Sequence, residues 1–131
     1  MRARLQHVST PYPRGEREHV REFYGGLLGL DEKPVPASLQ HLDLLWFGAG
    51  DGELELHFLP DPAGIQPHAR RHFCLEVEDL DTCRRRLADG GYEPYEEEAI
   101  PKRPRFFCRD PFGNLLEFTT ILGDYREAEA V

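Results

Sequence analysis

The sequence has few cysteines and no long hydrophobic run. Cys74, Cys83 and Cys108 are an odd set without CxxC spacing. They indicate neither a disulfide framework nor a zinc ribbon, and we expect a reducing, cytoplasmic compartment. No apolar run approaches the roughly 18 residues that a membrane span needs. Because an extended run also begins close to Met1, we expect no signal peptide.

The sequence also lacks an excess of basic residues. It has 16 Lys and Arg against 24 Asp and Glu, a net charge of −8. Nucleic acids and anionic membranes bind basic faces, so we expect neither as a partner. Hydrophobic residues make up 40% of the 131 residues and charged residues 31%, as in ordinary soluble proteins. A chain of this length can bury a core, and we expect a single domain over residues 1–131.

The first half of the sequence reads as a strand, a helix and a hairpin. His7 lies in a short extended run, Leu5–Ser9. A helix is predicted from Glu16 to a stop at Gly29, with apolar residues at helical spacing. These residues are Val20, Phe23, Tyr24, Leu27 and Leu28. Two further strands, Gln40–Phe47 and Glu53–Leu59, flank a glycine-rich turn and predict a hairpin.

The second half follows the same plan. His72 lies in the extended run Arg71–Val77, and a helix with Asp79 or Asp81 as its N-cap runs to Ala88. Three strands are predicted after this helix, the first weaker than the others. They are Tyr92–Glu97, Arg105–Arg109 and Leu115–Ile121, with a tight turn at residues 110–114 before the last.

The spacing of matching features indicates an internal repeat. His7 and His72 are 72 − 7 = 65 residues apart, and Glu55 and Glu117 are 117 − 55 = 62 apart. The helix ends at Gly29 and Gly91 are also 62 apart. This near-constant offset predicts the order β-α-β-β-β twice and a site where the halves meet.

The repeat gives expected boundaries for the two modules. Module one covers about residues 3–59 and module two about 70–122, with a linker at about 60–69. The polar tail, residues 123–131, is expected to be frayed or to serve as an arm.

Strand alternation predicts which side chains share a face. Side chains on a strand alternate with a period of two, and the apolar set packs against a helix. Phe73 and Leu75 belong to such an apolar set, so His72 is expected on the opposite face. The same reasoning places Glu117 away from the helix in its own strand, and likewise Glu55 with His57. We expect these polar side chains to face one cavity.

Two segments resemble signatures of a known family. Phe23–Leu30 (Phe-Tyr-Gly-Gly-Leu-Leu-Gly-Leu) and Asp110–Glu117 (Asp-Pro-Phe-Gly-Asn-Leu-Leu-Glu) resemble those of the vicinal oxygen chelate superfamily. The superfamily contains glyoxalase I, fosfomycin-resistance and bleomycin-resistance proteins, methylmalonyl-CoA epimerase and extradiol dioxygenases. The resemblance covers about residues 3–122. It implies an α+β fold of two tandem βαβββ modules that form a cupped mixed sheet, with a divalent metal ion, a small-molecule substrate and a homodimer.

The resemblance also implies a set of metal ligands. The family's first-strand histidine falls on His7, its fifth-strand histidine on His72 and its eighth-strand glutamate on Glu117. The fourth position falls on Glu55, which the 62-residue offset favours, with His57 as the rival. Imidazole and carboxylate ligands suit Zn, Ni, Co, Mn or Fe and leave positions open for substrate. Glu117 or Glu55 would then act as a general base.

A basic segment stands out in this acidic chain. Lys102, Arg103 and Arg105 lie within four residues, next to Pro101 and Pro104, at the start of a predicted strand. Arginine binds carboxylate and phosphonate groups bidentately, so these residues, Arg105 above all, are candidates for binding an anionic substrate group. The alternative is a solvated hairpin tip whose arginines pair with the acidic residues 96–98.

Three functions remain open at this point. The first is a glyoxalase-like, metal-dependent enzyme acting on a small oxygen-rich substrate, of the lyase, isomerase, epimerase or thiol-transfer type. The second is a metal-free, bleomycin-resistance-like protein that binds a drug. The third is a small extradiol-type dioxygenase, although classical ring-cleaving dioxygenases are about twice this length. Residues of ligating type at the ligand positions favour the enzymes.

Overall fold

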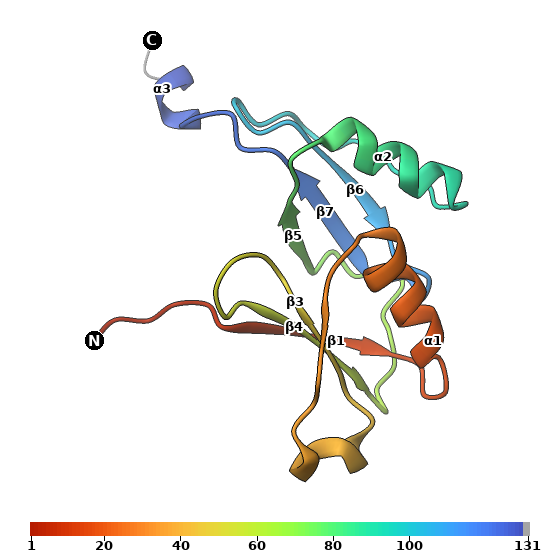
Figure 1. Ribbon diagram of the computed structural model, residues 1–131. Coiled ribbons are helices and arrows are strands. Elements are labelled where there is room, and N and C mark those ends of the chain that lie inside the picture. The colour runs from red at the N-terminus through yellow and green to blue at the C-terminus, as the bar shows by residue number, and fades with distance from the viewer. Residues whose placement is uncertain (130–131) are drawn as a thin grey trace. The chain divides into compact units, whose positions relative to one another are not determined.

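The computed structural model describes residues 1–129, which divide into two compact units (Figure 1). Unit 1 consists of Met1–Pro67 and Pro111–Asn114, and unit 2 consists of His68–Asp110 and Leu115–Val131. Of the predicted tail, residues 130 and 131 lie outside the described part of the chain. Each unit is built on its own β-sheet.

Unit 1 contains a four-stranded mixed sheet in the order β1-β4-β3-β2. The strands are β1 (His7–Tyr12), β2 (Glu32–Lys33), β3 (Leu45–Gly48) and β4 (Glu55–Pro60). β1 pairs with β4 in parallel, whereas β3 pairs antiparallel with both β4 and β2. The predicted hairpin between β3 and β4 is confirmed. Strand β2 is not predicted from the sequence, because it is only two residues long.

The helix of unit 1 changes its geometry along its length. It begins as α1 (Arg17–Val20) and continues as the π-helix η1 (Arg21–Leu27). The Leu28 N–H donates to the Phe23 carbonyl, five residues back, at 2.9 Å. Gly29 then adopts a φ of +76°, a left-handed conformation that glycine tolerates without strain. The predicted helix and its end at Gly29 are confirmed. The π-helical geometry of its second part was not predicted from the sequence.

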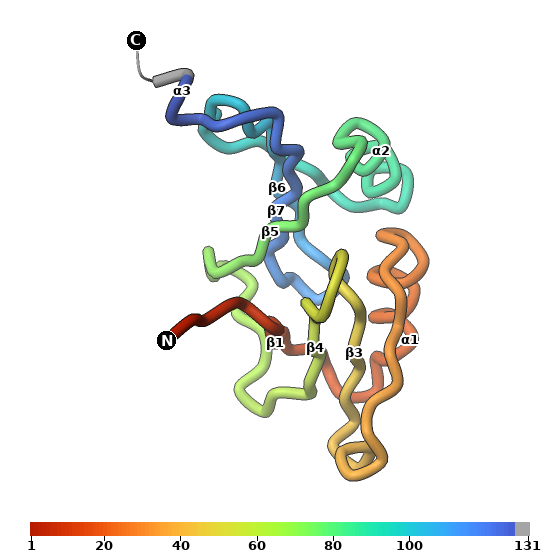
Figure 2. The backbone as a smooth tube through the Cα atoms, turned by 60° about the vertical axis from the view of Figure 1, so that its left-hand side comes forward, coloured from red at the N-terminus to blue at the C-terminus, as the bar shows by residue number. Residues whose placement is uncertain are grey.

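The predicted apolar face of this helix packs on the sheet. Tyr24 lies 4.4 Å from Phe58 of β4 and 6.4 Å from Phe47 of β3, between ring centroids. Figure 2 shows the helix running beside β3. The buried hydrophobic residues of unit 1 are Tyr12, Val20, Phe23, Tyr24, Leu45, Phe47, Leu56 and Phe58.

The predicted strand Gln40–Phe47 is wrong in its first half. Ala37–Leu42 forms the 3₁₀-helix η2, and Asp43 ends it with a φ of 57°. Two contacts hold this turn: Arg17 Nη1 donates to Asp43 Oδ1, and the Tyr12 hydroxyl donates to the Asp43 carbonyl, both at 2.6 Å. These contacts come from residues distant in sequence, and local strand propensity could not reveal them.

Unit 2 contains a three-stranded mixed sheet in the order β5-β7-β6. The strands are β5 (His72–Glu76), β6 (Arg105–Arg109) and β7 (Leu115–Thr119). β5 and β7 are parallel, and β6 and β7 are antiparallel. All three lie within predicted strands. The predicted strand Tyr92–Glu97 is reduced to a single bridge between Tyr95 and Phe107.

Helix α2 (Leu80–Asp89) covers one face of this sheet (Figure 1). The predicted N-cap is confirmed, because the Asp79 carboxylate accepts from the Thr82 N–H at 3.0 Å. Beneath the helix, Phe106 and Phe118 stack with their centroids 5.1 Å apart. Leu87, Phe106, Cys108, Leu116 and Phe118 are buried. The tail forms a short helix, α3 (Tyr125–Glu129).

The turn from Pro111 to Asn114 links β6 to β7 but belongs to unit 1. The Asn114 side-chain N–H donates to the Pro11 carbonyl in β1 at 2.9 Å. Gly113 has a φ of 99°, and a Cβ there would lie 3.6 Å from the Pro67 side chain. In the second signature, Gly113 therefore allows the conformation of this turn, and Asn114 anchors the turn to β1.

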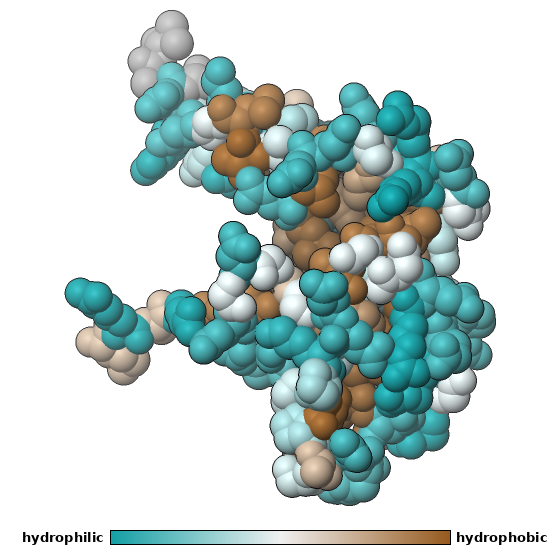
Figure 3. All heavy atoms as spheres, viewed as in Figure 1, coloured by the Kyte–Doolittle hydropathy of each residue, from teal (hydrophilic) through white to brown (hydrophobic). Residues whose placement is uncertain are grey.

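The visible surface is largely hydrophilic. Hydrophilic residues cover most of the visible face of each unit in Figure 3. Within residues 1–129, no helix combines the length and the hydrophobicity that a bilayer crossing requires.

Candidate functional site

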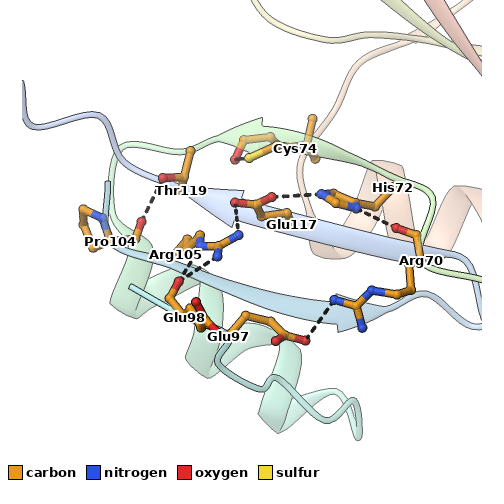
Figure 4. A network of polar contacts seen from close by, with 10 residues as sticks. Arg70, His72, Cys74, Glu97, Glu98, Pro104, Arg105, Glu117 and Thr119 are labelled. Carbon is orange, nitrogen blue, oxygen red and sulfur yellow. Dashed lines mark hydrogen bonds and ion pairs between the residues drawn. The ribbon is translucent and has the colours of Figure 1, made fainter. Parts of the chain in front are cut away.

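Two of the predicted ligands, His72 and Glu117, meet on one face of the unit 2 sheet (Figure 4). The His72 Nε2 atom lies 3.0 Å from Glu117 Oε1. The register places Cys74, not His72, directly opposite Glu117. His72 therefore reaches Glu117 diagonally, across two neighbouring parallel strands. Glu117 is buried, and the His72 side chain is 33% exposed.

Both ring nitrogens of His72 face an oxygen acceptor. Nδ1 lies 2.9 Å from the Arg70 carbonyl oxygen, and Nε2 lies 3.0 Å from Glu117 Oε1. A neutral imidazole can donate to only one of them. When Nδ1–H donates to the carbonyl, the Nε2 lone pair faces the carboxylate, and a proton or a metal ion between these two atoms would satisfy both.

The same separation fits two neighbouring ligands of one metal ion. Nitrogen and oxygen ligands bound at roughly 2.1 Å lie about 3.4 Å apart at the tetrahedral angle that zinc prefers, and about 3 Å apart at the right angle of an octahedral site. The observed distance between His72 Nε2 and Glu117 Oε1 is 3.0 Å. The donor set of this pair therefore fits a divalent metal ion.

Arg105 holds the other oxygen of the Glu117 carboxylate. Its Nη1 atom donates to Glu117 Oε2 at 3.3 Å, while Nε and Nη2 donate to the Glu98 carbonyl at 3.2 and 2.6 Å. Its guanidinium also lies 5.2 Å from the Phe107 ring centroid. Arg105 is thus brought to the site. The Arg103 guanidinium instead lies over the Tyr125 ring, at 4.8 Å.

Cys74 lies on the same face of β5 as His72, as alternation predicts (Figure 4). The residue is exposed overall. Even so, the pKa of Cys74 is raised to about 12. The main cause is burial of its thiol, and the second is the nearby negative charge of Glu117. A thiol with this pKa stays protonated at neutral pH, so it is a poor nucleophile and metal ligand.

The candidate residues of unit 1 form a second polar cluster around Glu55. His57 Nε2 donates to Glu55 Oε1 at 3.0 Å and Lys33 Nζ donates to Oε2, also at 3.0 Å. The Gln6 amide adds a longer contact of 3.4 Å to Oε1. These hydrogen bonds, first from His57 and then from Lys33, lower the pKa of Glu55 to about 2.

His7 faces this cluster and stacks on it. The ring centroids of His7 and His57 are 4.1 Å apart and their planes differ by 13°. Trp46 stacks on the other side of His57, also at 4.1 Å, with planes 5° apart. Its buried Nε1–H has no hydrogen-bond partner. His57 is therefore the middle layer of a three-ring stack.

Sequence reasoning missed Lys33 and Gln6. Lys33 lies in a two-residue strand without a recognisable pattern, and the register of β2 on β3 brings it to Glu55. Gln6 directly precedes the candidate ligand His7 in the sequence. This position was the one sign that Gln6 could belong to the site.

The residue paired with the candidate histidine differs between the two sheets, and this bears on the choice between Glu55 and His57. In unit 1, His7 is directly opposite Glu55, and His57 is two residues further along β4. In unit 2, Leu115 is opposite His72, and Glu117 is two residues further along β7. Strand register thus makes His57 the counterpart of Glu117, whereas the sequence offset favours Glu55.

The structure brings the candidate ligands together in two sets, one within each unit. Unit 2 holds His72 with Glu117, and unit 1 holds His7 with Glu55 and His57. Over residues 1–129, no cluster of three or more His, Cys, Asp or Glu side chains is arranged to hold a metal ion.

Comparison with known proteins establishes the family. Residues 4–118 match the model of the Glyoxalase/Bleomycin resistance protein/Dioxygenase superfamily, and the chain belongs to this superfamily. The expected α+β fold of the vicinal oxygen chelate proteins is confirmed by solved structures. A search of curated proteins gives no match.

The chain is similar to solved structures over nearly its whole length. A glyoxalase family protein from Bacillus anthracis is 31% identical, with a TM-score of 0.82, covering 92% of this chain and 97% of that one. The fosfomycin resistance protein FosX from Listeria monocytogenes is 14% identical, with a TM-score of 0.77 and coverages of 98% and 99%. The antibiotic binding protein TnmS3 from Streptomyces sp. CB03234 is 20% identical, with a TM-score of 0.70 and coverages of 91% and 96%.

Proposed function

We propose that the protein is a glyoxalase-like enzyme that depends on a divalent metal ion and acts on a small oxygen-rich substrate. The observation that carries this proposal is the His72–Glu117 pair, in which an imidazole nitrogen and a carboxylate oxygen, both metal-ligating atoms, lie 3.0 Å apart. Proteins with this fold include both enzymes and binding proteins, so the fold alone does not decide.

In this proposal His72 and Glu117 supply ligands from unit 2, and His7 supplies one from unit 1. Glu55 or His57 takes the fourth position. When bound, a Zn, Ni, Co, Mn or Fe ion would act as a Lewis acid that polarises two adjacent substrate oxygens. The reaction is then of the lyase, isomerase, epimerase or thiol-transfer type, with ring-cleaving dioxygenase chemistry as an alternative.

The remaining roles follow from the contacts of each carboxylate. Either Glu117 or Glu55 acts as the general base. Arg105 holds the Glu117 carboxylate at Oε2, whereas His57 and Lys33 hold the carboxylate of Glu55. Arg105, and more distantly Arg103, would attract an anionic substrate group. A homodimer in the cytoplasm completes the proposal.

A metal-free drug-binding protein is the second candidate. The His7–His57–Trp46 stack supports it, because stacked rings offer a flat aromatic ligand a platform. The similarity to the antibiotic binding protein TnmS3 is in line with this candidate. In this reading His72 and Glu117 form an ordinary ion pair.

Metal titration separates the two candidates. The metal-free protein is titrated with Zn²⁺, Ni²⁺, Co²⁺, Mn²⁺ and Fe²⁺ in a calorimeter. We expect about one ion per chain, and a loss of at least about 100-fold in affinity for His72→Ala and for Glu117→Ala. His68→Ala, which alters another exposed histidine of unit 2, is the matched control and should bind normally. Wild-type protein that binds none of the five ions would refute the enzyme and favour drug binding.

A further inference from the structure

The side chain of Gln6 is oriented by two acceptors. Its Nε2 atom lies 2.8 Å from the Glu53 carbonyl oxygen and 3.4 Å from Glu55 Oε1. Neither group can donate, so the amide nitrogen must face them and the amide oxygen must point away. The backbone strengthens this placement, because the Glu55 N–H donates to the Gln6 carbonyl at 2.9 Å.

The Gln6 amide oxygen faces His7. Gln6 Oε1 lies 2.8 Å from His7 Nδ1, and an amide oxygen only accepts. The proton of neutral His7 is therefore on Nδ1, and the lone pair is on Nε2. Stacking on His57 fixes the plane of the same ring.

His72 also has an acceptor beside its Nδ1 atom. The Arg70 backbone carbonyl oxygen lies 2.9 Å from Nδ1. In both histidines such an acceptor favours the Nδ1–H form, which leaves Nε2 as the nitrogen that can bind a metal. In His72 the acceptor is a backbone carbonyl, whereas in His7 it is a side chain that a mutation can remove.

We propose that Gln6 is a positioning residue that fixes the Nδ1–H tautomer of His7 and thereby presents Nε2 as a metal-binding nitrogen. The metal-binding part of this inference rests on the proposed function; the tautomer part does not. Hydrogen-bonding partners of ligating histidines commonly fix tautomer and ring orientation, and their loss weakens metal binding by about 10–100-fold.

The test measures the tautomer directly, without metal. Long-range ¹H–¹⁵N spectra of the imidazoles distinguish Nδ1–H from Nε2–H, at a pH where the rings are neutral. Gln6→Met keeps the length of the side chain but removes the acceptor. We expect the His7 tautomer ratio to shift towards Nε2–H by about 2- to 10-fold, the value of one hydrogen bond. His72 should keep its tautomer and so acts as an internal control.

Two further variants sharpen the test. Gln6→Glu retains an acceptor oxygen and should keep His7 as Nδ1–H. This variant still tests the role of the acceptor if Gln6→Met perturbs the fold. Gln40→Met makes the same chemical change at another exposed glutamine of unit 1 and should leave both histidines unchanged. In Zn²⁺ titrations Gln6→Met should bind about 10-fold more weakly than wild type, and Gln40→Met should bind equally.

The outcomes separate this inference from the proposed function. An unchanged His7 tautomer in Gln6→Met, or an Nε2–H tautomer in wild type, overturns the role of Gln6 even if zinc binds. Wild-type protein that binds no zinc overturns the enzyme and the metal-presenting role, while the tautomer spectra still decide whether Gln6 sets the state of His7.

Discussion

The Glu55 cluster should make the stability of the protein depend on pH in a way that one substitution can isolate. The pKa of Glu55 is about 2, against an ordinary value of 4.5, because His57 and Lys33 hydrogen-bond to its carboxylate. Since the folded pKa is depressed, the stabilisation is fully present above about pH 4.5. It is lost as the pH falls from about 4.5 towards 2.

The size of this effect follows from the shift. The folded pKa of about 2 lies about 2.5 below the ordinary value of 4.5, and at about 1.36 kcal/mol for each pKa unit this gives an upper limit of about 3–4 kcal/mol. The Glu55 side chain is 15% exposed, but its partner Lys33 is 36% exposed, so solvent screens the pair. We therefore expect about 1–2 kcal/mol.

The variant Glu55→Gln keeps the shape and the acceptor oxygen of the side chain but removes its charge. Urea unfolding of wild type and variant is followed by the fluorescence of Trp46, the single tryptophan, which stacks on His57 in this cluster. The stability difference should be about 1–2 kcal/mol at pH 7 and should shrink towards zero near pH 2. Other carboxylates titrate equally in both proteins and cancel. A difference that does not change with pH would refute the reasoning.

Two other measurements test the described structure. Asp79→Ala removes the cap of α2 at the Thr82 N–H and should cost about 1 kcal/mol in the free energy of unfolding, whereas Asp81→Ala should cost less; equal losses would contradict the capping role. Burial raises the pKa of Cys83 and of Cys108 to about 11, so iodoacetamide should label both at pH 8 at least about 10-fold more slowly in folded than in urea-unfolded protein. Equal rates would show that these thiols are open to solvent.

Much of the fold could be predicted from the sequence because local patterns and tertiary packing agree. Helical spacing of Val20, Phe23 and Tyr24 predicted the buried face of the first helix, and alternation predicted which side of β5 carries His72. The errors lie where distant contacts decide. The Asp43 turn depends on Tyr12 and Arg17, and its sequence does not show this.

The candidate site was predictable only in its residue types. The resemblance pointed to His72 and Glu117, and the structure brings these two together. The hydrogen bonds that set their state could not be read from the sequence, because they involve a backbone carbonyl at Arg70 and a guanidinium from β6. Likewise the Lys33–Glu55 pair depends on strand register, which spacing along the chain does not give.

The turn of residues 111–114 has a consequence for how the protein is made. Its Asn114 hydrogen bond to Pro11 joins residues 103 positions apart, so unit 1 lacks part of its framework until most of the chain has left the ribosome. Contacts of such long sequence separation slow folding. A fragment that ends at Pro67 would contain every strand of the first sheet but would lack residues 111–114 and their hydrogen bond to Pro11. The first half of the chain therefore does not contain the whole of unit 1.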